Sequence, residues 1–290
     1  MELSTLTVVS PIDGRYHSRT NSLAYYFSEY ALIRYRLKIE IAYFIFLGKN
    51  GFFKLTAADQ KKATKILTSF APTDALVVKE IERTTNHDVK AVEYFLKNKL
   101  KESGITKVTE WVHFGLTSQD INNTAIPLMW KDALNNEYLP ALNELIRQLT
   151  SLTKEWKNIP MLARTHGQPA SPTRLGKEIM VFVERLKSQQ KLLVAIPHTG
   201  KFGGATGNFN AHYAAFPNIK WHKLADEFLN NELGLRRQQF TTQIEHYDML
   251  AAFFDSLSRI NTILIDLCRD IWTYISMDYF KQKVIKNEVG

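Results

Sequence analysis

The sequence predicts a mostly α-helical protein built from long, roughly antiparallel helices. Apolar residues recur at spacings of three and four over most of the chain, which is the period of an amphipathic helix. Alternating apolar and polar residues, which mark a half-buried strand, are almost absent. A sustained heptad pattern near the end of the sequence is typical of a helix that packs in a bundle.

The first half of the chain carries three predicted helices. Thr56 is a predicted cap for the second of them, because its hydroxyl accepts a hydrogen bond from a free backbone N–H group of the first turn. Asp88 is the predicted cap of the third, which Gly104 ends. The first covers residues 22–48, where the periodic apolar side chains are Phe27, Tyr30, Ile33, Leu37, Ile41 and Phe44.

A long helical stretch is predicted from residue 120 to residue 157. Pro127 or Pro140 is expected to bend it, because proline lacks the backbone N–H group and clashes with the preceding turn. Pro160 closes the stretch. Ser171 as N-cap and Pro172 at the first helical position then predict another helix, which ends near residue 195.

The last predicted helix covers residues 247–280 and has the clearest pattern. Such an apolar seam needs partners, and oligomerisation through a shared bundle is one way to supply them. Cys268 flanks the seam, so we expect a packed, inert thiol. The seam consists of Leu250, Phe253, Leu257, Ile260, Leu264, Leu267, Ile271 and Tyr274.

Composition indicates a soluble protein of the cytoplasm. Of the 290 residues, 45% are hydrophobic and 23% are charged, close to the average for globular proteins, which argues against disorder. A single cysteine cannot form an internal disulfide, and this fits a reducing compartment. The first residues, "MELSTLTVV", lack the basic start of a signal peptide. The longest apolar run, residues 41–48, is far shorter than the ~20 residues that span a bilayer.

The net charge of +8 has two interpretations. It is either a solvated surface with excess lysine or a signal of an anionic partner, such as a phosphorylated or carboxylated metabolite or a nucleic acid. Lysine-rich pieces such as "KNKLK" at residues 97–101 lie in amphipathic patterns, and no basic tail is present. This weakens the nucleic-acid interpretation.

Five polar segments interrupt the helical pattern. Each places hydroxyl, amide, histidine or arginine groups at a predicted helix end, where free backbone N–H groups and the positive end of the helix dipole suit carboxylates and phosphates. Any one of them alone is explained by ordinary helix capping. The segments are "SPIDGRY" (10–16), "ERTTNHDVKAVEYFL" (82–96), "HFGLTSQDINN" (113–123), "RTHGQPASP" (164–172) and "TTQIEHYD" (241–248).

Other candidate sites are set aside. The glycine-rich "GKFGGATGN" at residues 200–208 matches neither the P-loop nor the dinucleotide-binding pattern. No spacing of histidine, cysteine and carboxylate residues indicates a metal site, and no Ser-His-Asp arrangement is supported. Five histidines are interpreted as surface or hydrogen-bonded core residues, namely His17, His198, His212, His222 and His246.

Taken together and in this order, the polar segments resemble the bacterial adenylosuccinate lyase family, a branch of the fumarase/aspartase superfamily. The resemblance covers the whole chain and includes "GATGNFNAH" and "TTQIE". It implies the long-helix bundle of the fumarase/aspartase type and β-elimination of fumarate from adenylosuccinate, which gives AMP. It also implies the same reaction on the succinylcarboxamide ribonucleotide intermediate of purine biosynthesis. It further implies a homotetramer with a shared helical bundle, and no cofactor.

The same resemblance assigns roles to residues. The reaction needs a base, an acid for the departing amine and fixed donors for the charge that develops on a carboxylate. His166 is implied to be the general acid, held by a tight turn that fixes its direction, and His87 is expected to assist catalysis. The implied substrate-binding residues are Arg15 and Tyr16 for the nucleotide, Asn86 and Asp88 for the phosphate or succinyl end, Thr117 and Ser118 for a carboxylate, and Gln243.

The sequence also departs from the family pattern. The family's base is a serine on a signature loop, and the given sequence ends at "KNEVG", where that loop should begin. We therefore expect an N-terminal helical domain at residues 1–115, an incomplete bundle domain at residues 116–290, no C-terminal domain and no activity in this chain alone. The alternatives are another lyase of the superfamily, a non-catalytic helical assembly protein of the same fold and, least favoured, a nucleic-acid binder.

Overall fold

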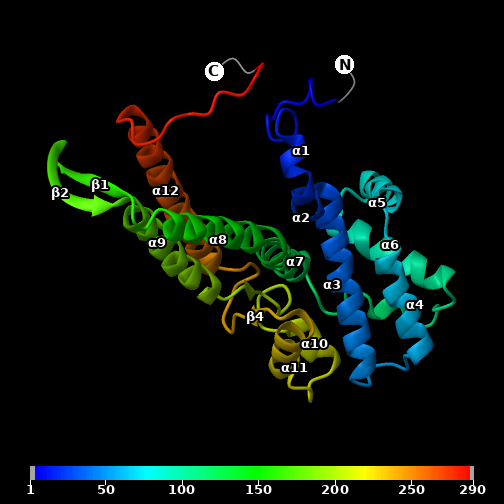
Figure 1. Ribbon diagram of the computed structural model, residues 1–290. Coiled ribbons are helices and arrows are strands. Elements are labelled where there is room, and N and C mark those ends of the chain that lie inside the picture. The colour runs from blue at the N-terminus through cyan, green and yellow to red at the C-terminus, as the bar shows by residue number, and fades with distance from the viewer. Residues whose placement is uncertain (1–3, 288–290) are drawn as a thin grey trace. The chain divides into compact units, whose positions relative to one another are not determined.

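The computed structural model describes residues 4–287 and is mostly helical (Figure 1). It contains two compact units, one formed by residues 1–139 and 197–247 and the other by residues 140–196 and 248–290. The predicted domain boundary between residues 115 and 116 concerns a different division of the chain and stays a prediction. Among the residues described, no helix has the length and apolarity needed to cross a membrane.

The helices and strands of the first unit are as follows. The helices are α1 His17–Thr20, α2 Ala24–Phe27, α3 Glu29–Lys49, α4 Ala57–Thr68, α5 Pro72–Thr85, α6 Asp88–Glu102, α7 Ser118–Ala133, α10 Asn210–Ala215 and α11 Trp221–Glu227. The strands are β3 Thr199–Gly200 and β4 Arg236–Arg237, which pair in parallel. The 3₁₀-helical segments are η1 Asn21–Leu23 and η2 Thr109–Trp111, and the π-helical segments are η3 Leu134–Tyr138 and η4 Phe228–Leu233.

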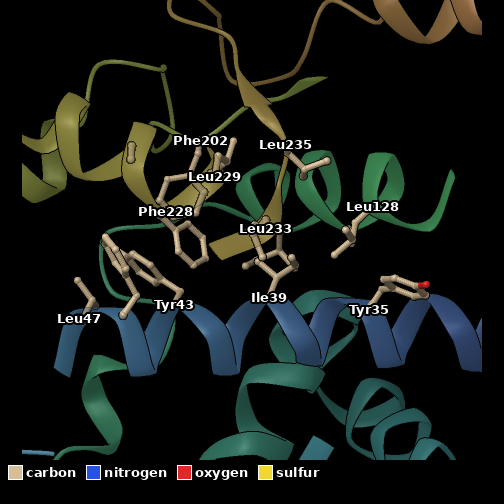
Figure 2. Packing of buried hydrophobic residues seen from close by; sticks show 14 of the residues in the cluster. Tyr35, Ile39, Tyr43, Leu47, Leu128, Phe202, Phe228, Leu229, Leu233 and Leu235 are labelled. Atoms are coloured by element: carbon tan, nitrogen blue, oxygen red, sulfur yellow. The ribbon is translucent and has the colours of Figure 1, made fainter. Parts of the chain in front are cut away.

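Helix α3 is the centre of the first unit because it is apolar on both sides. One face, with Ile33, Leu37 and Phe44, packs against α4, α5 and α6. The opposite face carries Tyr35, Ile39, Tyr43 and Leu47, which point toward Leu128 of α7 and toward the segment 202–235 in Figure 2. The predicted helix 22–48 is therefore right in its main part. Its regular turns begin after Ser28, whose hydroxyl accepts a hydrogen bond from the backbone N–H of Ala31 at 3.1 Å.

The predicted helical stretch 120–157 is confirmed as α7, the π-helical segment η3 and α8, Leu139–Glu155, which follow one another without a break. Pro127 lies inside α7, and the wider π-helical turns of η3 lie between Pro127 and Pro140. The predicted cap at Thr56 is also confirmed, because its hydroxyl accepts a hydrogen bond from the backbone N–H of Asp59 at 3.1 Å.

The second unit contains α8, a hairpin of β1 Pro160–Thr165 and β2 Gln168–Arg174, and the helices α9 Leu175–Ala195 and α12 Asp248–Ser276. The predicted helix start at Ser171 and Pro172 is wrong. Both residues lie in β2, where Pro172 pairs with Leu162 and Arg174 pairs with Pro160, and α9 begins only at Leu175. A two-stranded hairpin leaves its outer edges unpaired, so proline is tolerated there. Figure 1 shows the hairpin projecting beyond the adjoining ends of α8 and α9.

Helix α12 packs against α9 along an apolar stripe. The predicted seam is right at Phe253, Ile260 and Leu267, which are buried, but Leu257 and Leu264 are only half-buried. Their places in the stripe are taken by the residues at the neighbouring positions, Ser256 and Ile263. The helix also ends earlier than residue 280.

The predicted packing of Cys268 is wrong, because its thiol is exposed. It lies with Leu264, Ile265, Arg269 and Trp272 on an open apolar groove of α12. Trp272 is 74% exposed in this chain.

Candidate functional site

The N-terminus of α6 presents the first group of predicted site residues. Asn86 is the C-cap of α5, its backbone is in the left-handed region with φ of 50°, and the residue is exposed. His87, rather than the predicted Asp88, is the N-cap of α6, and its Nδ1 accepts a hydrogen bond from the backbone N–H of Lys90 at 3.1 Å. An imidazole nitrogen accepts only when it carries no proton, so the neutral His87 ring has its proton on Nε2. The neutral histidine therefore has an N–H donor at Nε2.

Asp88 is the first residue of α6 and is partly buried. Its Oδ2 forms an ion pair with the guanidinium of the buried Arg36 at 2.6 Å, and its Oδ1 accepts a hydrogen bond from Val89 N–H at 2.8 Å. Partial burial would raise the pKa of this carboxyl group, but the Arg36 guanidinium and the hydrogen bond hold the pKa below its usual range. Asp88 is thus a charged group with a protein partner, directly next to the exposed His87.

The N-terminus of α7 lies beside that of α6. The hydroxyl of Ser118 is 3.3 Å from Nε2 of His87, and the side chain of Gln243 donates to the Thr117 hydroxyl at 3.5 Å. Four predicted site residues, from three distant parts of the sequence, therefore meet at two adjoining helix N-termini. Such ends offer backbone N–H groups and positive dipole ends, so this cluster suits a carboxylate or a phosphate.

Arg15 and Tyr16 lie in the exposed segment that precedes α1. The Arg15 guanidinium lies 5.8 Å from the centroid of the Tyr16 ring, in a cation–π contact. The hydroxyl of Thr20 donates to the backbone carbonyl of Tyr16 at 3.1 Å. Within residues 4–287, no hydrogen bond or ion pair joins these two side chains to the cluster around His87.

His166 lies on the second compact unit, at the tip of the β1–β2 hairpin. The two residues of the turn, His166 and Gly167, both have positive φ, at 52° and 74°. Positive φ at both central positions matches the twist of a two-residue hairpin, and Gly167 adopts it without strain. The guanidinium of Arg164 donates to the Gly167 carbonyl at 3.3 Å. The predicted tight turn is confirmed, and the imidazole at its tip is exposed.

A buried ion pair, which no local sequence pattern predicts, lies beneath the N-terminus of α7. Asp120 and Lys201 are both completely buried, and Nζ of Lys201 lies 2.8 Å from Oδ1 of Asp120. Burial lowers the pKa of Lys201, and the neighbouring carboxylate opposes that shift. A lysine in a glycine-rich segment reads as a surface residue, because only the tertiary structure covers it.

A second buried network fixes the segment that carries Gln243. The side chain of Asn123 accepts a hydrogen bond from Glu245 N–H at 2.9 Å and donates to the Tyr247 hydroxyl at 2.8 Å. The Glu245 carboxylate is itself buried and accepts from the hydroxyl of Thr199 at 3.0 Å and from the side chain of Gln238. The motif "TTQIEHYD" thus has an anchored end, which the sequence alone did not distinguish from its exposed part.

One completely buried and one partly buried histidine also belong to this unit. His212 is completely buried, as the interpretation of it as a core residue required, and its Nε2 lies 3.2 Å from the Tyr43 hydroxyl. Burial lowers the pKa of His212 to about 4. The partly buried His113 was not among the predicted site residues, and its Nδ1 lies 2.5 Å from Oε1 of the buried Glu40. Burial lowers the pKa of His113, but Glu40 more than offsets this, so the pKa is raised above its usual value.

No group of three or more histidine, cysteine and carboxylate side chains with the geometry of a metal site occurs in the part of the chain that the structure describes.

A protein family described as lyase matches residues 14–290. An adenylosuccinate lyase of Dictyostelium discoideum is 54% identical to this chain over 302 aligned residues, which cover 100% of the chain and 64% of that relative. The adenylosuccinate lyases of Haemophilus influenzae and Escherichia coli K12 are 46% and 45% identical over 295 residues. The chain therefore spans 64% of the length of these relatives.

The solved structure of a fumarate lyase from Mesorhizobium has a similar fold. Its TM-score is 0.73 at 20% sequence identity, with 88% of this chain and 57% of that chain covered. A β-carboxy-cis,cis-muconate cycloisomerase of Acinetobacter calcoaceticus gives a TM-score of 0.71. The predicted helical fold of the fumarase/aspartase type is confirmed, and the chain belongs to the lyase family whose pattern it matches.

Proposed function

We propose that this chain is part of a C–N lyase of purine biosynthesis, which releases fumarate from adenylosuccinate to give AMP. The same reaction is proposed for the succinylcarboxamide ribonucleotide intermediate. The observation that carries the proposal is the 54% identity to an adenylosuccinate lyase across the whole chain. The meeting of His87, Thr117, Ser118 and Gln243 at two helix N-termini supports it, because the proposed substrates carry carboxylates and a phosphate.

The proposed reaction needs a base and an acid. A base removes the proton from the carbon next to a succinyl carboxylate, the C–N bond breaks and an acid protonates the leaving amine. His166 is the proposed acid, because imidazole is a common general acid in enzymes and the hairpin turn fixes the backbone of this residue. The base is assigned to no residue of this chain.

The cluster on the first unit is the proposed binding region for the anionic parts of the substrate. Thr117 and Ser118 would donate to a carboxylate whose charge increases during the reaction, and Nε2–H of His87 would assist them. Gln243 and Asn86 would complete the polar contacts, and Arg15 with Tyr16 would contact the nucleotide. Asp88 is proposed to contact the phosphate or succinyl end as well, from the position in which its ion pair with Arg36 holds it.

A homotetramer is the proposed assembly of the full-length protein, and the apolar groove on α12 supports it. Leu264, Ile265 and Trp272 expose apolar surface on one side of a long helix, which is unusual unless another chain covers it. Mass measurement by light scattering tests this proposal, and a soluble monomer at micromolar concentration would contradict it. The proposed location is the cytoplasm, which the single exposed cysteine fits.

Replacement of His166 tests the catalytic proposal. The variant is made in a completed enzyme, in which residues 1–290 are joined to the C-terminal part of the Dictyostelium relative. His166→Ala should lower turnover by about two to four orders of magnitude, the usual contribution of a positioned acid, with a much smaller effect on substrate affinity. The exposed His222 provides a control, since His222→Ala should leave fumarate release unchanged. More than a tenth of the normal rate in His166→Ala would refute the assignment.

Nucleotide analogues test the proposed contacts to phosphate. Arg15→Gln and His87→Gln should weaken the binding of AMP more than the binding of adenosine, because only AMP carries the phosphate. Titration calorimetry measures both ligands, and equal losses of affinity would place the phosphate contact elsewhere.

A further inference from the structure

We propose that Asp120 is the positioning residue of the candidate site, and that its carboxylate fixes the N-terminus of α7 against the glycine loop, residues 201–208. What the site binds rests on the proposed function, but the positioning itself does not.

The two oxygens of Asp120 hold two different parts of the chain. Oδ2 accepts a hydrogen bond from the backbone N–H of Thr117 at 2.8 Å, which ties it to the start of α7. Oδ1 accepts from Gly203 N–H at 2.8 Å, and Gly204 N–H lies 3.2 and 3.1 Å from the two oxygens. Successive backbone N–H groups in a turn form a concave anion site, and here the protein's own carboxylate occupies it.

Lys201 completes the arrangement. Its ammonium group contacts Asp120 and donates to the Gly204 carbonyl at 2.5 Å, so the loop is attached to Asp120 through backbone and side chain. Both charged groups are completely buried. A buried ion pair of this kind adds little stability relative to a well-packed apolar pair, because both charges lose their hydration. We infer that this pair serves to select one arrangement of the loop.

The position of Asp120 links it to the candidate site. Thr117 is held through its own backbone, and the next residue, Ser118, contacts His87. One turn further along α7, Asn123 holds Glu245 and Tyr247, which follow Gln243 by two and four residues. The start of α7 therefore carries both the site hydroxyls and the two side chains that hold distant loops.

The number of acceptor oxygens predicts which replacement breaks this device. An asparagine has nearly the shape of an aspartate, but only one of its two terminal atoms accepts hydrogen bonds. In Asp120→Asn, that oxygen can serve either Thr117 or the glycine loop, and the amide NH₂ group faces an N–H donor on the other side. Asp120→Asn also leaves the Lys201 charge without a partner, so Lys201→Met is combined with it to remove both charges.

The first experiment separates positioning from stability by hydrogen exchange. The double variant Asp120→Asn/Lys201→Met should unfold at a higher urea concentration than either single variant, because no buried charge stays unpaired. The backbone amides of Thr117, Gly203 and Gly204 should nevertheless exchange at least about 10-fold faster than in the unaltered chain, since a hydrogen bond to a charged group has been lost. If these amides exchange as slowly in the double variant as in the unaltered chain, the proposal is overturned.

Asp59→Asn is the matched control, because Asp59 accepts a hydrogen bond from Thr56 N–H at the start of α4 and binds no distant loop. It should leave the three amides unchanged. If the double variant does not fold, exchange in the unaltered chain decides. The Gly203 and Gly204 amides should then open together with Thr117, and independent fast exchange of the loop would refute the proposal.

The second experiment measures fumarate release in the completed enzyme. The double variant should lose about 10- to 100-fold in kcat/KM even where its stability has recovered, while Asp59→Asn stays within about twofold. Recovery of kcat/KM together with stability would show that Asp120 is only structural, which would overturn the proposal. If the unaltered completed enzyme releases no fumarate, the proposed function fails, and the hydrogen-exchange result still decides the positioning role.

Discussion

Helices α4 and α7 begin with the same local pattern but in opposite surroundings. The sequences "TAAD" at Thr56 and "TSQD" at Thr117 both place an aspartate at the third helical position. In each helix the aspartate accepts a hydrogen bond from the backbone N–H of the threonine, at 3.2 Å in α4 and 2.8 Å in α7. Each aspartate also has a lysine nearby. Lys62 lies 4.0 Å from Asp59, and Lys201 lies 2.8 Å from Asp120.

The two pairs differ in their exposure to solvent. The side chains of Asp59 and Lys62 are 27% and 48% exposed, whereas those of Asp120 and Lys201 are both at 0%. In α4 the second contact of the aspartate is local, to the Thr56 hydroxyl at 2.7 Å. In α7 the remaining contacts reach a loop about eighty residues away. One capping signal thus serves a helix end in the first case and joins distant segments in the second.

Removal of the lysine should separate the two pairs most strongly. Lys201→Met leaves a buried carboxylate without its counter-charge and should lower the free energy of unfolding by about 3–5 kcal/mol. Lys62→Met removes an exposed partner and should change it by less than about 0.5 kcal/mol. Urea denaturation of both variants makes the comparison. Similar losses for the two would mean that burial does not distinguish them.

Acid should destabilise the buried region before the exposed helix cap. His212 lies beside Asp120, Lys201 and Tyr43, and its pKa is lowered to about 4. Between pH 6.5 and 4 the unfolded chain binds a proton that the folded chain does not. About 3 kcal/mol of stability is therefore lost as the pH falls through this range.

The pKa of Asp59 is lowered by its hydrogen bond to Thr56, so its contribution is lost only below about pH 4, where the unfolded carboxyl group takes up a proton. Urea titrations at pH 7, 5.5 and 4.5 measure how steeply the free energy of unfolding falls as the pH falls. His212→Gln should flatten this slope, and Asp59→Asn should not. A slope that persists in His212→Gln would assign the titration to another group.

Removal of the threonine hydroxyls should have the smallest effects on stability. The larger loss of stability is now expected in α4, and the loss of activity in α7. Thr56→Ala removes an acceptor for Asp59 N–H and should cost about 1 kcal/mol of stability. The Thr117 hydroxyl has Gln243 as its partner at 3.5 Å, the outer limit of a hydrogen bond. Thr117→Ala should therefore cost less stability than Thr56→Ala, but it should lower kcat/KM in the completed enzyme. Thermal unfolding and fumarate release measure the two effects, and loss of activity in Thr56→Ala alone would reverse the comparison.

Several features were determined by the sequence alone. The helical period identified α3, the α7–α8 stretch and α12, because each buries a stripe that repeats at the helical spacing. Local chemistry identified the Thr56 cap and the turn at His166, since both depend on residues within a few positions. The motifs around His87, Thr117 and Gln243 also identified the segments that meet at the candidate site.

Other features were decided only by the tertiary structure. The β1–β2 hairpin was missed because Ser171 and Pro172 have the local signature of a helix start, and pairing with β1 overrides it. The seam of α12 was displaced at Ser256 and Ile263 because packing against α9 selects the buried face. The roles of Asp120 and Lys201 also depend on contacts between distant segments. A local pattern fixes which hydrogen bonds a residue offers, but removal from water depends on the rest of the fold, and that removal is what makes an ordinary capping aspartate an anchor.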